Sequence, residues 1–419
     1  MTDKYEKITP VLLGGDLNAY SMAMSFADAI GEVSEVFARE RLAVADLSSY
    51  INFHTVKDLH DCNVAVPELL SFAKRREKER LLLVPCADWY VEMLEYARDA
   101  LTGHFYFHIP SFEVWRAVSD KSSFIHLMDK YGVTHPKTEI FDERFLDFQK
   151  RGMRMKPPFV LKPADSSEYW RNPFPEMKKV YFITSLGEAK RIGEKIYSAG
   201  YQGKLLLQEY VGSTKAPPSA STLTVYMNRR SEAVRAVLGD VLLEELGPTA
   251  RGNYSAIMTR ELDGISRSLI AMLEGIKYTG IANFDILSSG GESYCLELNP
   301  RQGRSFDYLR SAGVNIASIL IADMKGERIA PDLSYREGLW RCVGKRTVQR
   351  YSDERALLKK AIAFEKSGDS CYAYDLRDGA TLQRKLYVLL HMQREEKRYR
   401  KYSARKKRAF IGWANDVKR

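Results

Sequence analysis

Short apolar runs and amphipathic stretches alternate in the first part of the chain. Strand-like runs are followed, twice, by segments whose apolar residues have helical spacing. Strands that alternate with helices favour an open parallel sheet, so the pattern predicts a small α/β domain over residues 1–112. Such sheets bind ligands at the carboxyl ends of their strands, where a Gly14-Gly15 turn is expected. The strand patterns are Pro10–Gly15, Glu35–Ala38 and Leu81–Pro85, and the helix patterns are Asn18–Ile30 and Asp88–Leu101.

The middle of the chain has a different order of strand and helix patterns. A helix is expected to begin at Ser119 or Asp120, either of which can cap it, and to end at Gly132. Farther on, two β-rich runs are joined by Ser-Ser-Gly-Gly-Glu, which is a strong hairpin signal. The hairpin strands are Ile281–Leu287 and Tyr294–Leu298, the other strands are Phe159–Lys162, Lys204–Val211, Val225–Met227 and Ala233–Leu238, and the helices are Ser185–Gly200 and Leu262–Tyr278.

Composition narrows the class of protein. Of the 419 residues, 45% are hydrophobic and 28% charged, and no apolar run approaches the roughly 20 residues that span a bilayer. The first residues contain no apolar stretch of signal-peptide type. We therefore expect a soluble cytoplasmic protein. The five cysteines are scattered and the seven histidines form no HxH or HExxH cluster, so neither a zinc site nor a redox dithiol is expected.

Positive charge is concentrated in the C-terminal tail. The formal net charge is +10, and thirteen Lys or Arg residues and three Asp or Glu residues lie between Arg384 and Arg419, so the remainder is close to neutral. The main body is therefore not expected to bind nucleic acid. In the tail, Leu386, Leu389 and Leu390 share one side of a helix pattern. The tail is either a solvated, partly frayed helix or a segment that contacts an anionic partner, most simply a membrane surface.

The predicted hairpin carries groups that a divalent cation binds, in the segments NFDIL and YCLELNPRQGRS. Glu297 and Asn299 are two residues apart on one strand, so their side chains share a face. Asp285 joins that face if the hairpin is centred on Gly291, as a three-residue loop with a bulge would make it. A strict two-residue Gly290-Gly291 loop would place the carboxylates on opposite faces. Carboxylate and amide oxygens suit Mg²⁺; the alternative is that these side chains are solvated on an edge strand.

Two lysines and a hinge precede the hairpin. Lys162 ends the apolar strand in FVLKP, and Lys121 begins a helix, where the helix N-terminus disfavours a cation unless an anion binds there too. Each is a candidate phosphate ligand, although a lysine in either place, taken alone, is usually a solvated one. Between these lysines and the hairpin, the segment LLQEYVG places an acidic residue and a backbone hinge at the end of a strand.

Taken in this order and spacing, the segments resemble the ATP-grasp superfamily over about residues 110–325. The resemblance implies a mixed α/β (α+β) fold, with a two-lobed ATP-grasp module that we place at residues 113–330, followed by a basic helical C-terminal extension at 331–419. It also implies ATP and two Mg²⁺ ions as cofactors. The roles that it implies are phosphate contacts for Lys121 and Lys162, adenine binding for Gln208, Glu209, Tyr210 and Val211, Mg²⁺ coordination for Asp285, Glu297 and Asn299, and catalysis for Lys162, Arg301 and Arg304.

One segment departs from the superfamily pattern. The phosphate loop after the second lysine is usually rich in glycine, whereas here it reads ADSSEYW, with Lys178-Lys179 beyond it. Backbone N–H groups and serine hydroxyls could still hold phosphate. The longer stretch KPADSSEYWRNPF…KKVYF is similar to the bacterial D-aspartate ligases, which add D-aspartate to the lysine side chain of a peptidoglycan precursor.

The resemblance implies an ATP-dependent ligase that activates a carboxylate as an acyl phosphate and joins it to an amine. The narrower similarity points to D-aspartate as the acid and to the lysine side chain of UDP-MurNAc-pentapeptide as the acceptor. A diacid needs a grip on its second carboxylate, for which Arg301, Arg304 and either Arg251 or Arg260 are candidates because a guanidinium binds carboxylates bidentately. The residues expected to leave room for the acceptor are Gly14, Gly15 and Asn18.

Alternative functions remain at this point. One is another ATP-grasp reaction, such as carboxylation or synthesis of a free dipeptide, which the motifs do not separate from amide ligation. Another is a nucleotide-binding regulatory protein without turnover, against which the intact set of metal ligands and Arg301 argues. A homodimer is a further alternative for the assembly.

Overall fold

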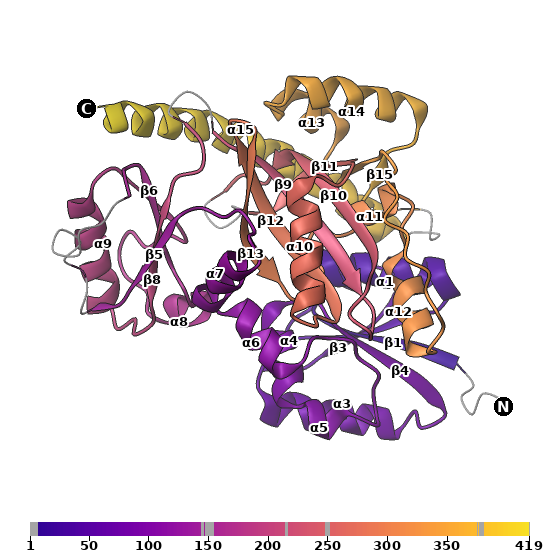
Figure 1. Cartoon of the computed structure of the whole chain (residues 1–419). Helices are drawn as coiled ribbons and strands as arrows, with labels where there is room; N and C mark the ends of the chain where they lie inside the picture. Colours follow the sequence, from indigo (N-terminus) through magenta and orange to yellow (C-terminus); the bar gives the residue numbers. More distant parts are fainter. Residues whose placement is uncertain are drawn as a thin grey trace.

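Three β-sheets organise the part of the chain that this computed structural model describes (Figure 1). The described residues are 7–143, 146, 155–213, 217–247, 252–374, 376 and 381–418, with backbone alone for residues 166, 167 and 405–418. The sheets have four, four and seven strands. The predicted mixed α/β fold, with an N-terminal parallel sheet and a C-terminal helix, is confirmed. The division at residues 112 and 330 stays a prediction.

The N-terminal sheet is parallel throughout, with strand order β3-β2-β1-β4, as the alternating pattern predicted. Its central strand is buried because helices cover both faces. The single helix expected over Asp88–Leu101 is instead two helices that meet at Ala97. β3 escaped prediction because only its first residue is buried. The elements are β1 (Lys7–Leu13), α1 (Leu17–Ile30), β2 (Ser34–Ala38), α2 (Ala43–Asp46), β3 (Ile51–Thr55), α3 (Cys62–Lys74), β4 (Glu79–Pro85), α4 (Asp88–Tyr96) and α5 (Arg98–Leu101).

A small lobe follows, built on an antiparallel sheet of order β5-β8-β6-β7. Asp120 caps the helix that leads into it, accepting a hydrogen bond of 2.8 Å from the Ser123 backbone N–H. The lobe has its own core, which the amphipathic α9 closes. The elements are α6 (Phe112–Ser119), α7 (Lys121–Lys130), β5 (Thr138–Phe141), β6 (Phe159–Pro163), α8 (Ser166–Arg171), β7 (Tyr181–Ile183), α9 (Leu186–Ser198) and β8 (Leu205–Glu209).

The large sheet has the order β13-β12-β9-β10-β11-β14-β15 and is antiparallel except for its last pair. α10 packs on one face through apolar side chains such as Leu269 and Leu273. The other face joins α1 and α12 in a core that the N-terminal domain shares. The elements are β9 (Ser219–Met227), β10 (Ala233–Glu244), β11 (Tyr254–Arg260), α10 (Gly264–Gly275), β12 (Gly280–Ser289), β13 (Glu292–Asn299), α11 (Tyr308–Ser311), α12 (Ile316–Met324), β14 (Leu339–Arg341), α13 (Lys345–Tyr351), α14 (Arg355–Ser367), β15 (Cys371–Tyr372) and α15 (Leu382–Lys418).

The basic tail forms α15, which Figure 1 draws in yellow. The interpretation of this segment as a solvated, frayed helix is wrong for its first five turns, because Arg384, Val388 and Tyr399 are buried against the rest of the protein. Arg384 donates to Val44 O at 2.6 Å, and its guanidinium lies over the ring of Tyr20. Within the described residues, no helix is both long enough and apolar enough to cross a membrane.

Candidate active site

The β12–β13 hairpin brings Asp285 directly opposite Glu297, and Asn283 opposite Asn299. All four side chains therefore share one face of the large sheet. Of the two arrangements that the sequence allowed, the one with both carboxylates on the same face is observed, but a three-residue loop does not produce it. The turn is a two-residue Gly290-Gly291 turn with both φ angles positive, and a bulge between Asp285 and Ile286 shifts the pairing by one residue.

Burial and opposite charge set the ionisation of the two carboxyl groups. Burial and the charge of Glu297 raise the pKa of Asp285, although a hydrogen bond of 2.9 Å from the Tyr254 hydroxyl opposes the shift. Burial would also raise the pKa of Glu297, but the positive charges of three lysines outweigh it and hold that pKa below its ordinary value. Two half-buried carboxyl groups therefore share one face, and cations face them. The lysines are Lys121, Lys162 and Lys179.

The small lobe supplies these lysines. Lys162 lies on β6, opposite Leu206 of β8, and burial and then Lys121 and Lys179 lower its pKa to about 8, although Glu297 opposes them. The ammonium of Lys121 donates to Ala164 O at 2.9 Å, which links the start of α7 to the end of β6. Both predicted lysines are thus brought to the metal-type carboxylates. Lys179 joins them, although the sequence had not singled it out as a ligand.

The predicted hinge residues lie at the end of β8. The amide of Gln208 donates to Thr138 Oγ1 at 2.8 Å, and the Glu209 backbone N–H donates to Lys137 O at 2.9 Å. The Tyr210 backbone N–H donates to Pro158 O at 3.1 Å. Val211 is buried, and Gly212 follows with a positive φ, so the chain turns here. The four predicted hinge residues therefore form the connection from the small lobe toward the large sheet.

The segment after Lys162 is a helix rather than the extended phosphate loop that its position in the superfamily implies. Asp165 caps α8, because its carboxylate accepts a hydrogen bond of 3.0 Å from the Glu168 backbone N–H. A helix needs no glycine at these positions, which accounts for the departure from a glycine-rich sequence.

Two arginines follow β13 and contact acidic residues from elsewhere in the chain. Arg301 forms an ion pair of 2.7 Å with Asp88 at the start of α4, and it lies 3.4 Å from Asn299 Oδ1. Its Nε atom is buried without a hydrogen-bond partner. Arg304 forms a short ion pair with Glu245, which is almost fully buried after β10. Sequence reasoning found both arginines but neither acidic partner, because the partners are distant along the chain.

A further acidic residue from the N-terminal domain faces the arginines. Asp16 follows β1 and caps α1, accepting a hydrogen bond of 3.1 Å from the Asn18 backbone N–H. Burial raises the pKa of Asp16, and the charges of Arg304 and then Arg301 oppose that shift. The carboxyl end of the parallel sheet therefore borders the arginines, as its topology predicts.

The turn after β1 leaves no room for a bulky acceptor, so that expectation is wrong. A Cβ atom at Gly14 would lie 3.0 Å from the Cβ of Cys86, and one at Gly15 would lie 3.1 Å from a neighbouring side chain. Asn18 is buried and donates to Gln302 O at 3.1 Å. The two glycines instead allow close packing within the N-terminal domain, and Asn18 joins that domain to the loop that carries the two arginines.

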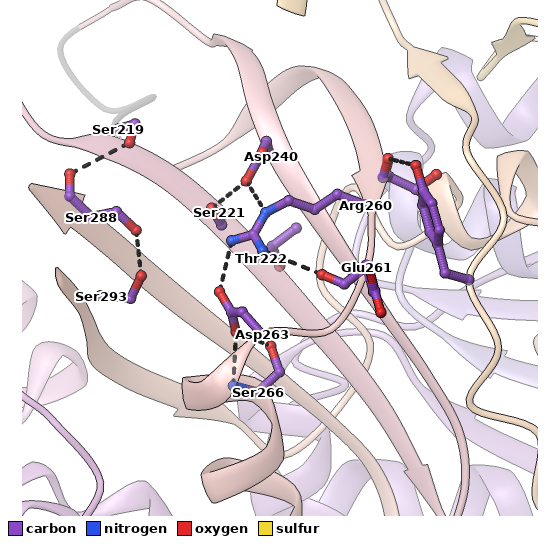
Figure 2. Close-up of polar contacts among 12 residues, drawn as sticks. Ser219, Ser221, Thr222, Asp240, Arg260, Glu261, Asp263, Ser266, Ser288 and Ser293 are labelled. Carbon is purple, nitrogen blue, oxygen red and sulfur yellow. Dashed lines mark hydrogen bonds and ion pairs between the residues drawn. The ribbon is translucent and has the colours of Figure 1, made fainter. Parts of the chain in front are cut away.

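Arg260 does not reach the metal-type carboxylates. It pairs with Asp240 at 2.7 Å and with Asp263 at 2.9 Å, as Figure 2 shows. Register places Arg260 and Asp240 beside Ser221, on the face opposite Asp285, where Asp263 also caps α10. Arg260 therefore fastens α10 to the sheet and is unavailable as a grip for a diacid. The other candidate, Arg251, lies outside the described residues.

The donor set fits Mg²⁺ better than a transition metal. In the described ranges, no group of three or more His, Cys, Asp or Glu side chains could hold a metal ion. The hairpin instead offers two carboxylates and one amide oxygen beside lysines, which matches the habit of Mg²⁺ of binding one or two carboxylates together with substrate phosphates. A divalent cation here would also relieve the repulsion between Asp285 and Glu297.

Comparison with known proteins extends this description. No family model matches the chain. A curated D-aspartate ligase of Enterococcus faecium (strain Aus0004) is 28% identical over 383 residues, which cover 88% of this chain and 90% of that protein. The solved biotin carboxylase domain of Hydrogenobacter thermophilus 2-oxoglutarate carboxylase, in complex with MgADP, ADP and bicarbonate, matches with a TM-score of 0.61 at 15% identity, over 79% of this chain and 73% of that one. The ADP complex of N5-carboxyaminoimidazole ribonucleotide synthetase matches with a TM-score of 0.59 at 13% identity, over 87% and 88% of the two chains.

The fold, with a lysine-bearing small lobe over a carboxylate-bearing sheet, is therefore an ATP-grasp fold, similar to that of these two solved enzymes. The sequence is similar to D-aspartate ligase along nearly the whole length of both proteins.

Proposed function

We propose that the chain uses ATP and Mg²⁺ to phosphorylate a substrate carboxylate and then joins the acyl group to an amine. The observation that carries the proposal is the placement of Lys121, Lys162 and Lys179 against the half-buried pair Asp285 and Glu297. Phosphate oxygens and a divalent cation bound among these groups would balance their charges. The ADP complexes of the fold relatives support the same use of the site.

In this proposal, each group has a defined task. The lysines hold the β- and γ-phosphates while the substrate carboxylate attacks the γ-phosphorus, and positioning and charge neutralisation supply most of the catalysis. Asp285, Glu297 and Asn299 would hold Mg²⁺, which supplies further neutralisation of phosphate charge. The backbone of Glu209 and Val211 would bind adenine, with Gln208 and Tyr210 beside it.

The arginines would act on the acyl group. The Nε–H of Arg301 is buried and has no protein acceptor, so it is available to an oxygen of the acyl phosphate. Arg304 is about one-third exposed, and it would hold a substrate carboxylate or the oxyanion that forms when the amine attacks. That attack releases phosphate and forms the amide, without a covalent enzyme intermediate.

The acid that we propose is D-aspartate, and the acceptor is the lysine side chain of a cell-wall precursor such as UDP-MurNAc-pentapeptide. Support comes from the similarity to D-aspartate ligase over 88% of the chain. It also comes from chemistry, because a diacid presents one carboxylate for phosphorylation and a second for Arg304 or Arg301 to hold. Arg260 is not a candidate for this contact, because it pairs with Asp240 and Asp263.

The proposed function is tested by ADP release from the purified protein. L-Asp, D-Asp, L-Glu, D-Glu, D-Ala and bicarbonate are offered in turn, each with and without the acceptor peptide. We expect ADP and amide product to require ATP, Mg²⁺, D-Asp and the acceptor together. Equal product from D-Asp and D-Ala would remove the substrate proposal, ADP release with bicarbonate would favour a carboxylase, and no release with any acid would favour a regulatory protein.

We also propose that α15 contacts an anionic membrane surface. Four leucines are exposed on the helix, with Leu382 83% and Leu389 53% exposed. Exposed Lys385 precedes most of them, and exposed Arg394, Lys397 and Lys401 follow. A row of exposed apolar side chains flanked by basic ones is the pattern that lies on a bilayer containing anionic lipid. The leucines are Leu382, Leu386, Leu389 and Leu390.

A further inference from the structure

Glu245 lies between two arginines that come from different parts of the chain. One is Arg304, which forms a short ion pair with Glu245. The other is Arg398 of α15, whose Nη2 atom is 3.7 Å from Glu245 Oε2. The Glu245 side chain is only 7% exposed. Arg398 also forms an ion pair of 3.3 Å with Glu395 of its own helix, so two arginines and two carboxylates form one cluster beside the loop that carries Arg301 and Arg304.

Side chains of α15 also donate hydrogen bonds to backbone carbonyl oxygens on either side of Glu245. Arg398 donates to Leu246 O, and its guanidinium also packs over Gly247. The hydroxyl of the adjacent Tyr399 donates to Glu244 O at 2.6 Å and lies 2.7 Å from Ser255 Oγ. Tyr399 is fully buried. Two consecutive residues of α15 therefore hold the residues that surround Glu245 and the start of β11.

The opposite side of the cluster is also formed by α15. Burial and the charges of Arg304, Arg394 and Arg398 lower the pKa of His391 to about 4, although Glu245 opposes the shift. The His391 ring packs on Tyr374, with 4.5 Å between centroids. His391 is thus neutral at physiological pH and adds no further cation beside Arg304.

We propose that α15 is a positioning element of the active site, in which Arg398 acts through Glu245 to fix the guanidinium of Arg304. The inference rests on the proposed function, because it assigns to Arg304 the substrate carboxylate or the oxyanion. Arg304 is partly exposed and has many rotamers, so a buried ion pair held from behind by a second arginine restricts it to one orientation. Arg398 does not itself contact the substrate. It is a positioning residue.

The test compares Arg398→Ala and Glu245→Gln, singly and together, with Arg400→Ala as the matched control. Arg400 lies on the same helix and is exposed. We expect Arg398→Ala to lower kcat/KM for the acid about 10- to 100-fold, with KM for ATP nearly unchanged, as for the loss of a group that orients a catalytic residue. The double variant should be no worse than the more impaired single variant, because both changes interrupt one chain of contacts. Arg398→Lys should restore part of the activity because it keeps the positive charge.

Two results would overturn the proposal. One is a lower Tm for Arg398→Ala with kcat/KM for the acid equal to that of Arg400→Ala. The other is additive losses in the double variant. If the wild-type protein turns over no acid, the proposed function fails, and side-chain NMR of ¹⁵N-arginine then tests the positioning alone. The Nε–H signal of Arg304, assigned with Arg304→Lys, should shift in Arg398→Ala and stay in place in Arg400→Ala; an unchanged signal in both would contradict the inference.

Discussion

At the scale of single residues, the candidate site is a balance of buried charges. Asp285 and Glu297 are brought to one face, and their mutual repulsion is offset by lysines from another lobe. The pKa of Glu297 is lowered despite its burial, so this carboxylate remains ionised near neutral pH. Removing ionised groups from water costs free energy, even where they are paired. A half-buried carboxylate beside three lysines is the arrangement that binding of MgATP would use.

Replacement of Glu297 by Gln tests the cation site. The change keeps the shape of the side chain but removes the charge that would bind Mg²⁺, so we expect turnover to fall by at least about 10²-fold while the fold is kept. Glu292→Gln is the control, because Glu292 lies on the same strand and is exposed. Steady-state rates at saturating Mg²⁺ and thermal unfolding measure the two effects. Near-normal turnover of Glu297→Gln would refute the assignment.

The charged residues that stand within recognisable motifs lie near one another in the structure. Lys121, Lys162, Asp285 and Glu297 were identified because each has a fixed place beside an apolar strand or at a helix start. The acidic partners of the arginines were missed, because Asp88, Glu245 and Asp16 stand in no motif and reach the site only through tertiary packing. Tyr254 was missed for the same reason, since β11 itself was not predicted.

At the scale of elements, the hairpin illustrates what period and turn chemistry can predict. The alternation of residues placed Glu297 and Asn299 on one face and allowed Asp285 to join them, and Gly290-Gly291 marked the turn. The bulge could not be placed from the sequence, because its extra residue, Leu296, lies within the regular alternation of β13, and the pairing of β12 with β9 shows no irregularity. Asp285 and Glu297 therefore share a face because of a bulge whose position the sequence alone does not specify.

The lobe that carries β6 gives a second prediction. Lys162→Ala removes a cation that we propose contacts phosphate, so ATP affinity should fall by about 10- to 100-fold, the range for a lost charge-assisted hydrogen bond. Calorimetric titration with MgATP measures the change. Lys195→Ala serves as the control on the same lobe, since Lys195 forms an exposed ion pair with Glu176 at 3.0 Å. Equal affinities for MgATP in the two variants would show that Lys162 does not contact the nucleotide.

At the scale of the whole molecule, the N-terminal domain contributes residues that contact the candidate active site. Asp88 holds Arg301, and Asn18 holds the backbone of Gln302, so contacts from α1 and α4 fix the loop after β13. The parallel sheet was predicted from its pattern of strands and helices. Its contribution to the arginines could not be, because nothing in the first 112 residues specifies which surface it meets.

The helix α15 gives a prediction about membrane contact, and its buried residues decide which variant can test it. Removing α15 would expose the surfaces that Arg384, Val388 and Tyr399 cover, so a truncated chain is a poor test of membrane contact. The joint change of Leu386, Leu389 and Leu390 to Ser leaves those contacts in place. We expect co-sedimentation with vesicles that contain phosphatidylglycerol to fall at least about tenfold, because each buried leucine contributes roughly 1.5–3 kcal/mol.

The control for vesicle binding is Leu333→Ser, which changes an exposed leucine distant from α15 in the sequence. Binding should also weaken as salt is raised, since the basic residues act through screened charge. If the triple variant sediments as the wild type does, or if neither binds vesicles, the membrane proposal is wrong and the leucines are simply exposed.

The course of α15 has a consequence for how the protein is made. The helix reaches Val44 at one end and the β10–β11 strands at the other, and it follows both in the chain. A ribosome therefore completes both sheets and the motifs of the ATP site before the segment that joins them has emerged. Nascent chains should hold a nearly assembled but inactive centre, with the surfaces that await Arg384 and Tyr399 open to chaperones. The site would reach its full geometry only after the helix has been made and has packed against both sheets.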